Sequence, residues 1–235
     1  MALPELNTAR YTVEIPSTGQ TVTYRPYLVK EEKVLMMAME SNDSKMIIQT
    51  IVNVIKSCIY DEVDIDSLAM FDIETLFLAL RSKSVGEKVD LKIKCEECEH
   101  RNEVQIDFDD IQKPVIDDSE KRVMLTEDVG VVLKYPALKD VERFAEHGDE
   151  SIQSAMKMIT ACIDSIFDAD NLYDAKNETV EALDKFLDSL NNEQFTKLSE
   201  FFKEMPALHS TISFNCTSCN HANSEELRGL QSFFT

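Results

Sequence analysis

The spacing of apolar residues changes along the chain in an order that occurs twice. Residues 10–28 carry apolar side chains at every second position on both sides of a turn, which predicts a β-hairpin. Residues 123–135 show the same alternation around Gly130 and predict a second hairpin. Pro26 ends the first hairpin and Pro136 ends the second, because proline cannot continue a strand's hydrogen bonding.

Helical spacing follows each hairpin. After the first hairpin we expect helices over residues 30–40 and 45–59. After the second we expect a helix that begins near Lys139 and another over residues 152–166, each of the longer helices having one apolar face. Both longer helices carry a lone cysteine ahead of an acidic loop, namely Cys58 before residues 61–66 and Cys162 before residues 168–174.

Shorter elements complete each part of the chain. We expect further helices at residues 71–80, 180–190 and 194–204, short strands at residues 89–93 and 104–108, and one strand through Ile212 and Phe214. The same eight-residue motif, Cys-x-x-Cys-x-His-x-Asn, then stands at the end of each part.

This repeated order predicts an α+β fold of two similar halves that arose by internal duplication. The best boundary is the polar stretch 109–120. The first half then covers residues 1–115 and contains the Cys-x-x-Cys turn, or knuckle, at residues 95–98. The second half covers residues 116–235 and contains the knuckle at residues 216–219. We expect the two halves to form one compact unit. Two unrelated knuckles with coincidentally similar flanks are the alternative.

Composition supports a folded protein in a reducing compartment. The chain has 235 residues, 43% of them apolar, with only five Gly and six Pro, which disfavours both disorder and a turn-rich all-β fold. No apolar run is long enough to span a membrane, and residues 1–10 do not resemble a signal peptide. In the cytosol, paired cysteines hold metal more often than they form disulfides.

The economical model is one structural zinc ion shared by both knuckles. Each Cys-x-x-Cys turn supplies two ligands, and a closed structural site needs four. The four ligands would be Cys95, Cys98, Cys216 and Cys219, joining the two halves in a zinc-ribbon-like site. Redox pairs, disulfides, or separate sites that use His100 and His221 as third ligands remain open alternatives. A catalytic zinc is disfavoured, because four thiolates leave no position for water.

Charge and motifs narrow the function. The net charge is −20, from 44 acidic and 24 basic residues, which repels phosphate backbones and argues against nucleic-acid binding. It fits either simple solubility or an acidic face for a basic protein partner. A cluster of methionines (Met36, Met37, Met39 and Met46) is more typical of a core than of an adaptable partner surface. The acidic residues 168–174 lack the glycine and glutamate of a calcium loop.

No catalytic constellation is evident. There is no glycine-rich phosphate loop, no Gly-x-Ser-x-Gly and no His-Glu-x-x-His motif. We therefore expect neither an enzyme nor a small-molecule substrate. The apolar C-terminus, with Phe233 and Phe234, is expected to pack back on the protein or to dock into a neighbour.

Several stretches of the chain resemble one known family. They are Tyr11-Thr-Val-Glu-Ile-Pro-Ser-Thr-Gly, Lys30-Glu-Glu-Lys-Val-Leu, Phe71-Asp-Ile-Glu-Thr-Leu-Phe-Leu, Arg81-Ser-Lys-Ser-Val-Gly-Glu and the ending Leu227-x-Gly-Leu-x-x-Phe-Phe. Together with the first knuckle they resemble the baseplate hub assembly proteins of contractile-tailed, T-even-type bacteriophages, over nearly the whole chain.

The resemblance implies a late viral protein that helps to build the central hub of the tail baseplate. Its partners would be other baseplate and hub proteins, with membrane contact not expected. The resemblance places such a protein in the host cytoplasm during assembly or in the baseplate of the virion tail. The resemblance is consistent both with a permanent component of the virion and with a transient assembly factor, or chaperone. A zinc-stabilised regulatory or adaptor protein that binds a basic partner is the alternative from another class.

Overall fold

The computed structural model describes residues 7–41, 43–119, 121–145 and 152–229, and the chain folds into two compact units. The first unit consists of Met1–Ile65, Phe71–Val115 and Ala207–Thr235, and the second of Asp66–Met70 and Ile116–Pro206. The chain leaves the first unit after Val115 and returns to it at Ala207, so the segment with the second cysteine motif belongs to the first unit.

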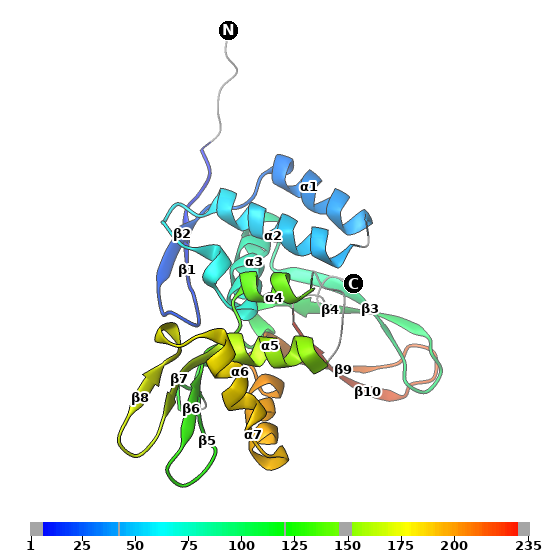
Figure 1. The fold of residues 1–235 in the computed structure, drawn as a ribbon. Helices are drawn as coiled ribbons and strands as arrows, with labels where there is room; N and C mark the ends of the chain where they lie inside the picture. Colours follow the sequence, from blue (N-terminus) through cyan, green and yellow to red (C-terminus); the bar gives the residue numbers. More distant parts are fainter. Residues whose placement is uncertain (1–6, 42, 120, 146–151, 230–235) are drawn as a thin grey trace. The chain divides into compact units, whose positions relative to one another are not determined.

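Within its described residues, the first unit consists of helices and of three two-stranded hairpins, β1–β2, β3–β4 and β9–β10 (Figure 1). Its elements are β1 (Tyr11–Glu14), β2 (Thr21–Tyr24), α1 (Val29–Glu40), α2 (Ser44–Cys58), α3 (Met70–Ser84, entered from the second unit at Met70), β3 (Lys88–Lys94), β4 (Arg101–Asp107), β9 (His209–Asn215) and β10 (Ala222–Arg228). Short 3₁₀ turns lie at Ile65–Ser67 and Phe108–Asp110. Helix α3 buries apolar residues on several faces, which suits a central helix.

The β1–β2 hairpin is antiparallel, and its turn is closed by Gly19 at a φ of 67°, a conformation that glycine adopts without strain. At the start of α1 the carboxylate of Glu31, buried in the fold, accepts hydrogen bonds from Arg25 (2.9 Å) and from the N–H of Leu28 (2.8 Å). Burial alone would raise the pKa of the Glu31 carboxyl, but these hydrogen bonds outweigh it and lower the pKa.

The expectation that the methionine cluster forms core is wrong. Met36 and Met37 on α1 are 58% and 70% exposed, and Met39 and Met46 are also exposed. On α1 the residues that point inward are Glu31, Leu35 and Ala38, which are spaced by about one helical turn. The methionines on α1 lie off that stripe, so α1 presents part of an apolar face to solvent.

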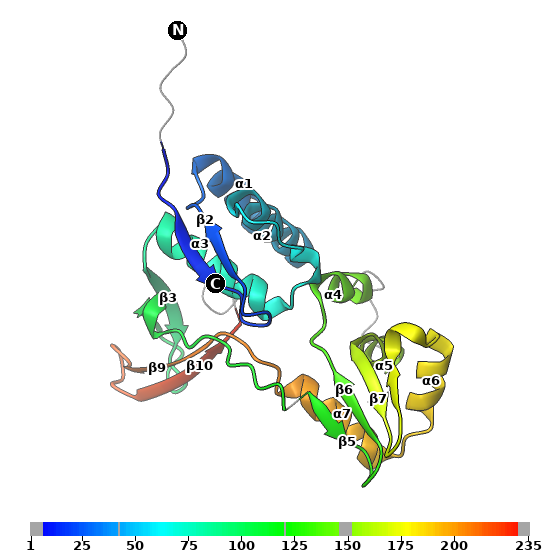
Figure 2. The same cartoon turned by 90° about the vertical axis from the view of Figure 1, so that its left-hand side faces the viewer.

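The second unit is a four-stranded antiparallel sheet with helices packed on it. Its elements are β5 (Arg122–Met124), β6 (Gly130–Leu133), α4 (Leu138–Ala145), α5 (Ile152–Cys162), β7 (Ile163–Phe167), β8 (Leu172–Asp174), the 3₁₀ turn Ala175–Asn177, α6 (Val180–Asp188) and α7 (Asn192–Lys203). The strand order is β5-β6-β7-β8, and α7 lies along β5 (Figure 2). The core is built by Leu125, Val131, Leu133, Ile159, Ile163, Leu183, Leu187, Leu198 and Phe201.

One predicted helix ends earlier than expected. The helix expected over residues 152–166 ends at Cys162, and Ile163–Phe167 forms β7 instead. The apolar residues here fit a helical face and a strand equally well, and pairing with β6 decides for the strand. The acidic segment that follows is a turn leading into β8, where the Asp168 carboxylate accepts hydrogen bonds from the N–H groups of Asp170 (2.9 Å) and Asn171 (2.7 Å).

The lone cysteines occupy matching positions in the two units. The carbonyl of Cys58 accepts the N–H of Arg25 (3.0 Å), just after β2, and the carbonyl of Cys162 accepts the N–H of Lys134 (2.8 Å), just after β6. In each case the next residue, an isoleucine, pairs with the last residue of that strand. Burial raises the pKa of the Cys58 thiol to about 11 and that of the Cys162 thiol to about 12.

None of the helices within the described residues is long and apolar enough to cross a membrane.

Candidate metal centre

The two cysteine motifs form turns of the same geometry at the tips of the hairpins β3–β4 and β9–β10, which lie side by side (Figure 1 and Figure 2). We call the turns of residues 95–100 and 216–221 the first and second knuckle. In the first, the N–H of Cys95 donates to the carbonyl of His100 (2.9 Å) and the N–H of Glu99 to the carbonyl of Cys95 (3.0 Å). The corresponding distances in the second knuckle are 2.8 and 2.9 Å.

The backbone of each knuckle passes through the left-handed region at the same motif position. Glu99 has a φ of 56° and Asn220 a φ of 59°. Few residues other than glycine adopt this conformation, and asparagine does so more readily than glutamate. The position directly follows the second cysteine, so the left-handed residue is what turns the chain back into the returning strand.

The four cysteines of the motifs come together in the first unit. Their sulfurs all lie within 4.8 Å of one another, and Cys95–Cys219 and Cys98–Cys216 are each 3.6 Å apart. Four sulfurs bound to one ion at about 2.3 Å in a tetrahedron are about 3.8 Å apart. The four cysteines could therefore hold a metal ion, and both pairs contribute to the same cluster. Cys95 and Cys216 are buried, while Cys98 and Cys219 are exposed.

Each knuckle is also bound by an asparagine from the other hairpin. The Asn102 side-chain oxygen accepts the N–H (2.9 Å) and the hydroxyl (3.0 Å) of Thr217, which directly follows Cys216. The Asn223 oxygen accepts the N–H of Glu96 (3.0 Å), which directly follows Cys95. The two contacts are equivalent, so they relate the knuckles as an approximate two-fold axis would.

Local hydrogen bonds favour the thiolate form in the buried cysteines. The N–H of Cys219, with help from that of Ser218, lowers the pKa of the Cys216 thiol to about 6. Burial alone would raise the pKa of the Cys95 thiol, but the N–H groups of Cys98 and Glu97 outweigh it and lower the pKa.

The exposed Cys219 behaves in the opposite way. The N–H of His221 acts to lower the pKa of its thiol, but the neighbouring sulfurs of Cys98, Cys95 and Cys216, together with burial, raise it to about 12. Thiolates this close repel one another, so they cannot all ionise without a compensating charge. A bound cation would supply that charge.

The histidines of the motif take part through their backbone only. The side chains of His100 and His221 are exposed, while their carbonyls accept the cysteine N–H groups. Neither belongs to the cluster of possible ligands among the described residues. The sequence analysis assigned no role to Asn102 and Asn223. Their repetition at the last position of the motif, two residues after the histidine, was the signal that could have revealed one.

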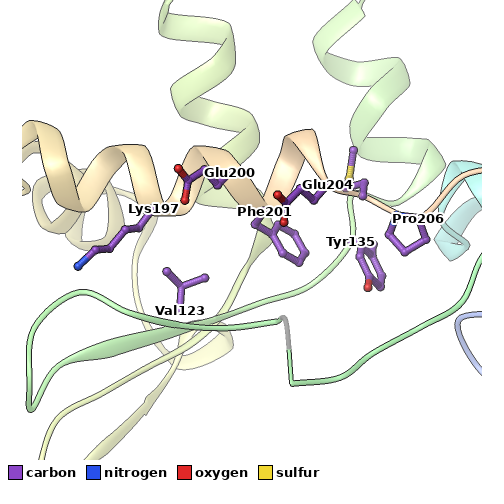
Figure 3. Close-up of a pocket in the computed structure, with 8 residues that line it drawn as sticks. Val123, Tyr135, Lys197, Glu200, Phe201, Glu204 and Pro206 are labelled. Carbon is purple, nitrogen blue, oxygen red and sulfur yellow. The ribbon is translucent and has the colours of Figure 1, made fainter.

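A small cavity lies elsewhere, in the second unit, between α7 and β5 (Figure 3). Its volume is about 200 Å³, and its lining combines apolar groups, among them Val123 and Phe201, with the carboxylates of Glu200 and Glu204. Tyr135 stacks on Phe201 at 5.4 Å between ring centres. Lys197 also lines the cavity, and its amine forms a salt bridge with Glu193 (3.5 Å).

A family model described as T4 bacteriophage base plate protein matches residues 8–235. The chain belongs to this family of phage base plate proteins, and it is a structural protein of the base plate. No curated protein and no solved structure matched the chain.

Proposed function

We propose that this protein helps to build the central hub of the phage tail baseplate through protein–protein contacts, and that it is not an enzyme. The observation that carries the proposal is the family match over residues 8–235. The resemblance of the Lys30–Leu35 and Arg81–Glu87 stretches to hub assembly proteins supports the narrower assignment to the hub.

The proposed contacts are protein surfaces. Net charge −20 favours a basic partner and disfavours nucleic acid. On α1 the exposed Met36 and Met37, with Val29 at 64% exposure, offer an adaptable apolar surface of the kind that partner-binding proteins use. The expected contact through Phe233 and Phe234 lies outside the described residues.

We further propose that one structural zinc ion is held by Cys95, Cys98, Cys216 and Cys219. Sulfur-only ligation selects soft or borderline metals, and zinc is the common choice for closed four-cysteine sites. Such an ion would supply folding free energy, since both hairpins must be ordered to bind it. Metal analysis of purified protein tests this, with one zinc per chain expected and none after substitution of Cys95 by serine.

The matching surroundings of Cys58 and Cys162, and of the two knuckles, support the proposal that the chain arose by duplication of a hairpin, helix-pair and knuckle unit. In that case β7, β8 and the helices α6 and α7 enlarge the second copy.

The hub assignment is tested by affinity capture from infected cells, compared with purified mature particles. Recovery of hub proteins with the tagged chain from both sources would indicate a permanent virion component. Recovery from infected cells alone would indicate an assembly factor in the host cytoplasm. Capture of peripheral baseplate proteins without hub proteins would contradict the hub assignment.

A further inference from the structure

We infer that Asn102 and Asn223 are positioning residues of the four-cysteine site, each acting on the knuckle of the opposite hairpin. This inference rests on the proposed metal site. It gives a role to the last residue of the repeated motif, which the sulfur ligands alone do not explain.

Asn102 uses both ends of its side-chain amide. Its oxygen accepts two hydrogen bonds from Thr217, and its nitrogen donates to the carbonyl of His100 (3.0 Å) in its own hairpin. The same nitrogen lies 3.7 Å from the sulfur of Cys216, within range for an N–H···S hydrogen bond. The residue is 3% exposed. A buried amide that is satisfied on both sides holds its neighbours in one arrangement.

Asn223 repeats this arrangement from the other side. Its oxygen accepts the N–H of Glu96, and its nitrogen donates to the carbonyl of His221 (2.9 Å). The residue is 4% exposed. Each asparagine therefore binds the residue that follows the first cysteine of the opposite knuckle, and Asn102 also reaches the sulfur of that cysteine.

This exchange has two consequences for metal binding. First, an amide N–H pointing at a sulfur favours its thiolate form and fixes its direction, as hydrogen-bonded neighbours of metal ligands generally do. Second, the exchange ties the two hairpins together at the point where their sulfurs meet. Both knuckles are then held in place before an ion arrives, which reduces the ordering cost of binding.

The test measures zinc affinity of the full chain by competition with a chelator of known affinity. Asn102→Ala and Asn223→Ala are each expected to weaken binding about 10- to 100-fold, the usual effect of losing such a neighbour. The control is Asn215→Ala, which removes an exposed asparagine next to Cys216 and should leave the affinity unchanged. Far-ultraviolet circular dichroism checks that each variant is folded.

A second variant separates positioning of the metal site from capping of the turn. Asn102→Asp keeps an acceptor for Thr217 but loses the donor toward Cys216 and the His100 carbonyl, and it adds a negative charge beside the thiolates. We expect Asn102→Asp to bind zinc at least as weakly as Asn102→Ala, and its cobalt-loaded form to show a shifted sulfur-to-metal charge-transfer band. If Asn102 acted only as the acceptor for Thr217, Asn102→Asp would behave as the unmodified protein.

Different results would contradict the proposed metal site and the positioning role of the two asparagines. If the unmodified chain binds no zinc, the proposed metal site fails. If it binds one zinc and both alanine variants bind as tightly as Asn215→Ala, the site stands and the positioning role is overturned. The same holds if Asn102→Asp binds as tightly as the unmodified chain.

Discussion

Replacing Gly130 with alanine is expected to destabilise the second unit, for a reason that one neighbouring side chain supplies. Gly130 in β6 is paired with Phe167 in β7. A Cβ atom at position 130 would lie 2.9 Å from each Cε atom of the Phe167 ring and still closer to its Cζ. Carbon atoms normally approach to about 3.5 Å, so the ring or the strand must move.

Two opposing effects set the size of the change. Overpacking of this kind typically costs about 1–3 kcal/mol. The backbone φ of Gly130 is not positive, so alanine would otherwise gain about 0.4–1 kcal/mol by restricting the unfolded chain. The steric effect is the larger, and we expect a net loss of about 1–2 kcal/mol in the free energy of unfolding.

The sign should reverse when the obstructing atoms are removed. Phe167→Leu takes away Cε1, Cε2 and Cζ, so Gly130→Ala in that background should stabilise by up to about 1 kcal/mol. Urea denaturation of the four proteins, followed by circular dichroism, gives the coupling between the two sites. Stabilisation by Gly130→Ala alone, or the same loss in both backgrounds, would refute the steric reasoning.

Three further predictions concern the first unit and the lone cysteines. Removal of the proposed zinc ion by a chelator, or Cys95→Ser, should lower the midpoint of thermal unfolding of the first unit markedly, because a structural zinc ion contributes folding free energy; an unchanged midpoint would contradict the proposed site. Glu31→Gln should destabilise the protein at neutral pH, because the lowered pKa of Glu31 means that its carboxylate form is stabilised by folding. The difference between Glu31→Gln and the unmodified protein should shrink as the pH falls below about 4 and the carboxylate is protonated; a difference that grows with acid in denaturation curves would contradict the assignment. Cys58 and Cys162 should resist a thiol reagent in the native protein at neutral pH, because both are buried with raised pKa values, and should react once urea unfolds the chain; rapid labelling without urea, seen by mass spectrometry, would argue against their burial.

The sequence predicted the elements whose periodicity is unambiguous. Alternation over residues 89–93 and 104–108 foretold β3 and β4, and the apolar face of residues 45–59 foretold α2. The prediction of a helix through Ile163 and Ile166 was wrong. Residues three apart can share a helical face, and these two form a strand because they pair with β6, which lies about thirty residues earlier in the sequence.

The clustering of the four cysteines was predictable from the sequence, whereas the hydrogen bonds that surround it were not. The spacing of the cysteines is a local signal, and it brought out all four residues that the fold gathers. Asn102 and Asn223 each accept a hydrogen bond from the opposite knuckle. These bonds depend on how two hairpins that are distant in sequence face each other, which local spacing does not specify. Exposure of Met36 and Met37 was likewise a matter of tertiary packing.

The longer segment of the second unit, Ile116–Pro206, is flanked by two backbone segments of the first unit that pair with each other. Gln112 and His209 exchange backbone hydrogen bonds, with N–H to carbonyl distances of 2.9 and 3.2 Å, shortly before the departure at Val115 and shortly after the return at Ala207. These bonds close the first unit on itself, as the neighbouring ends of an inserted domain usually do. Sub-global opening of this segment therefore need not separate the knuckles, and a metal ion held by the four cysteines would stay bound during such an opening.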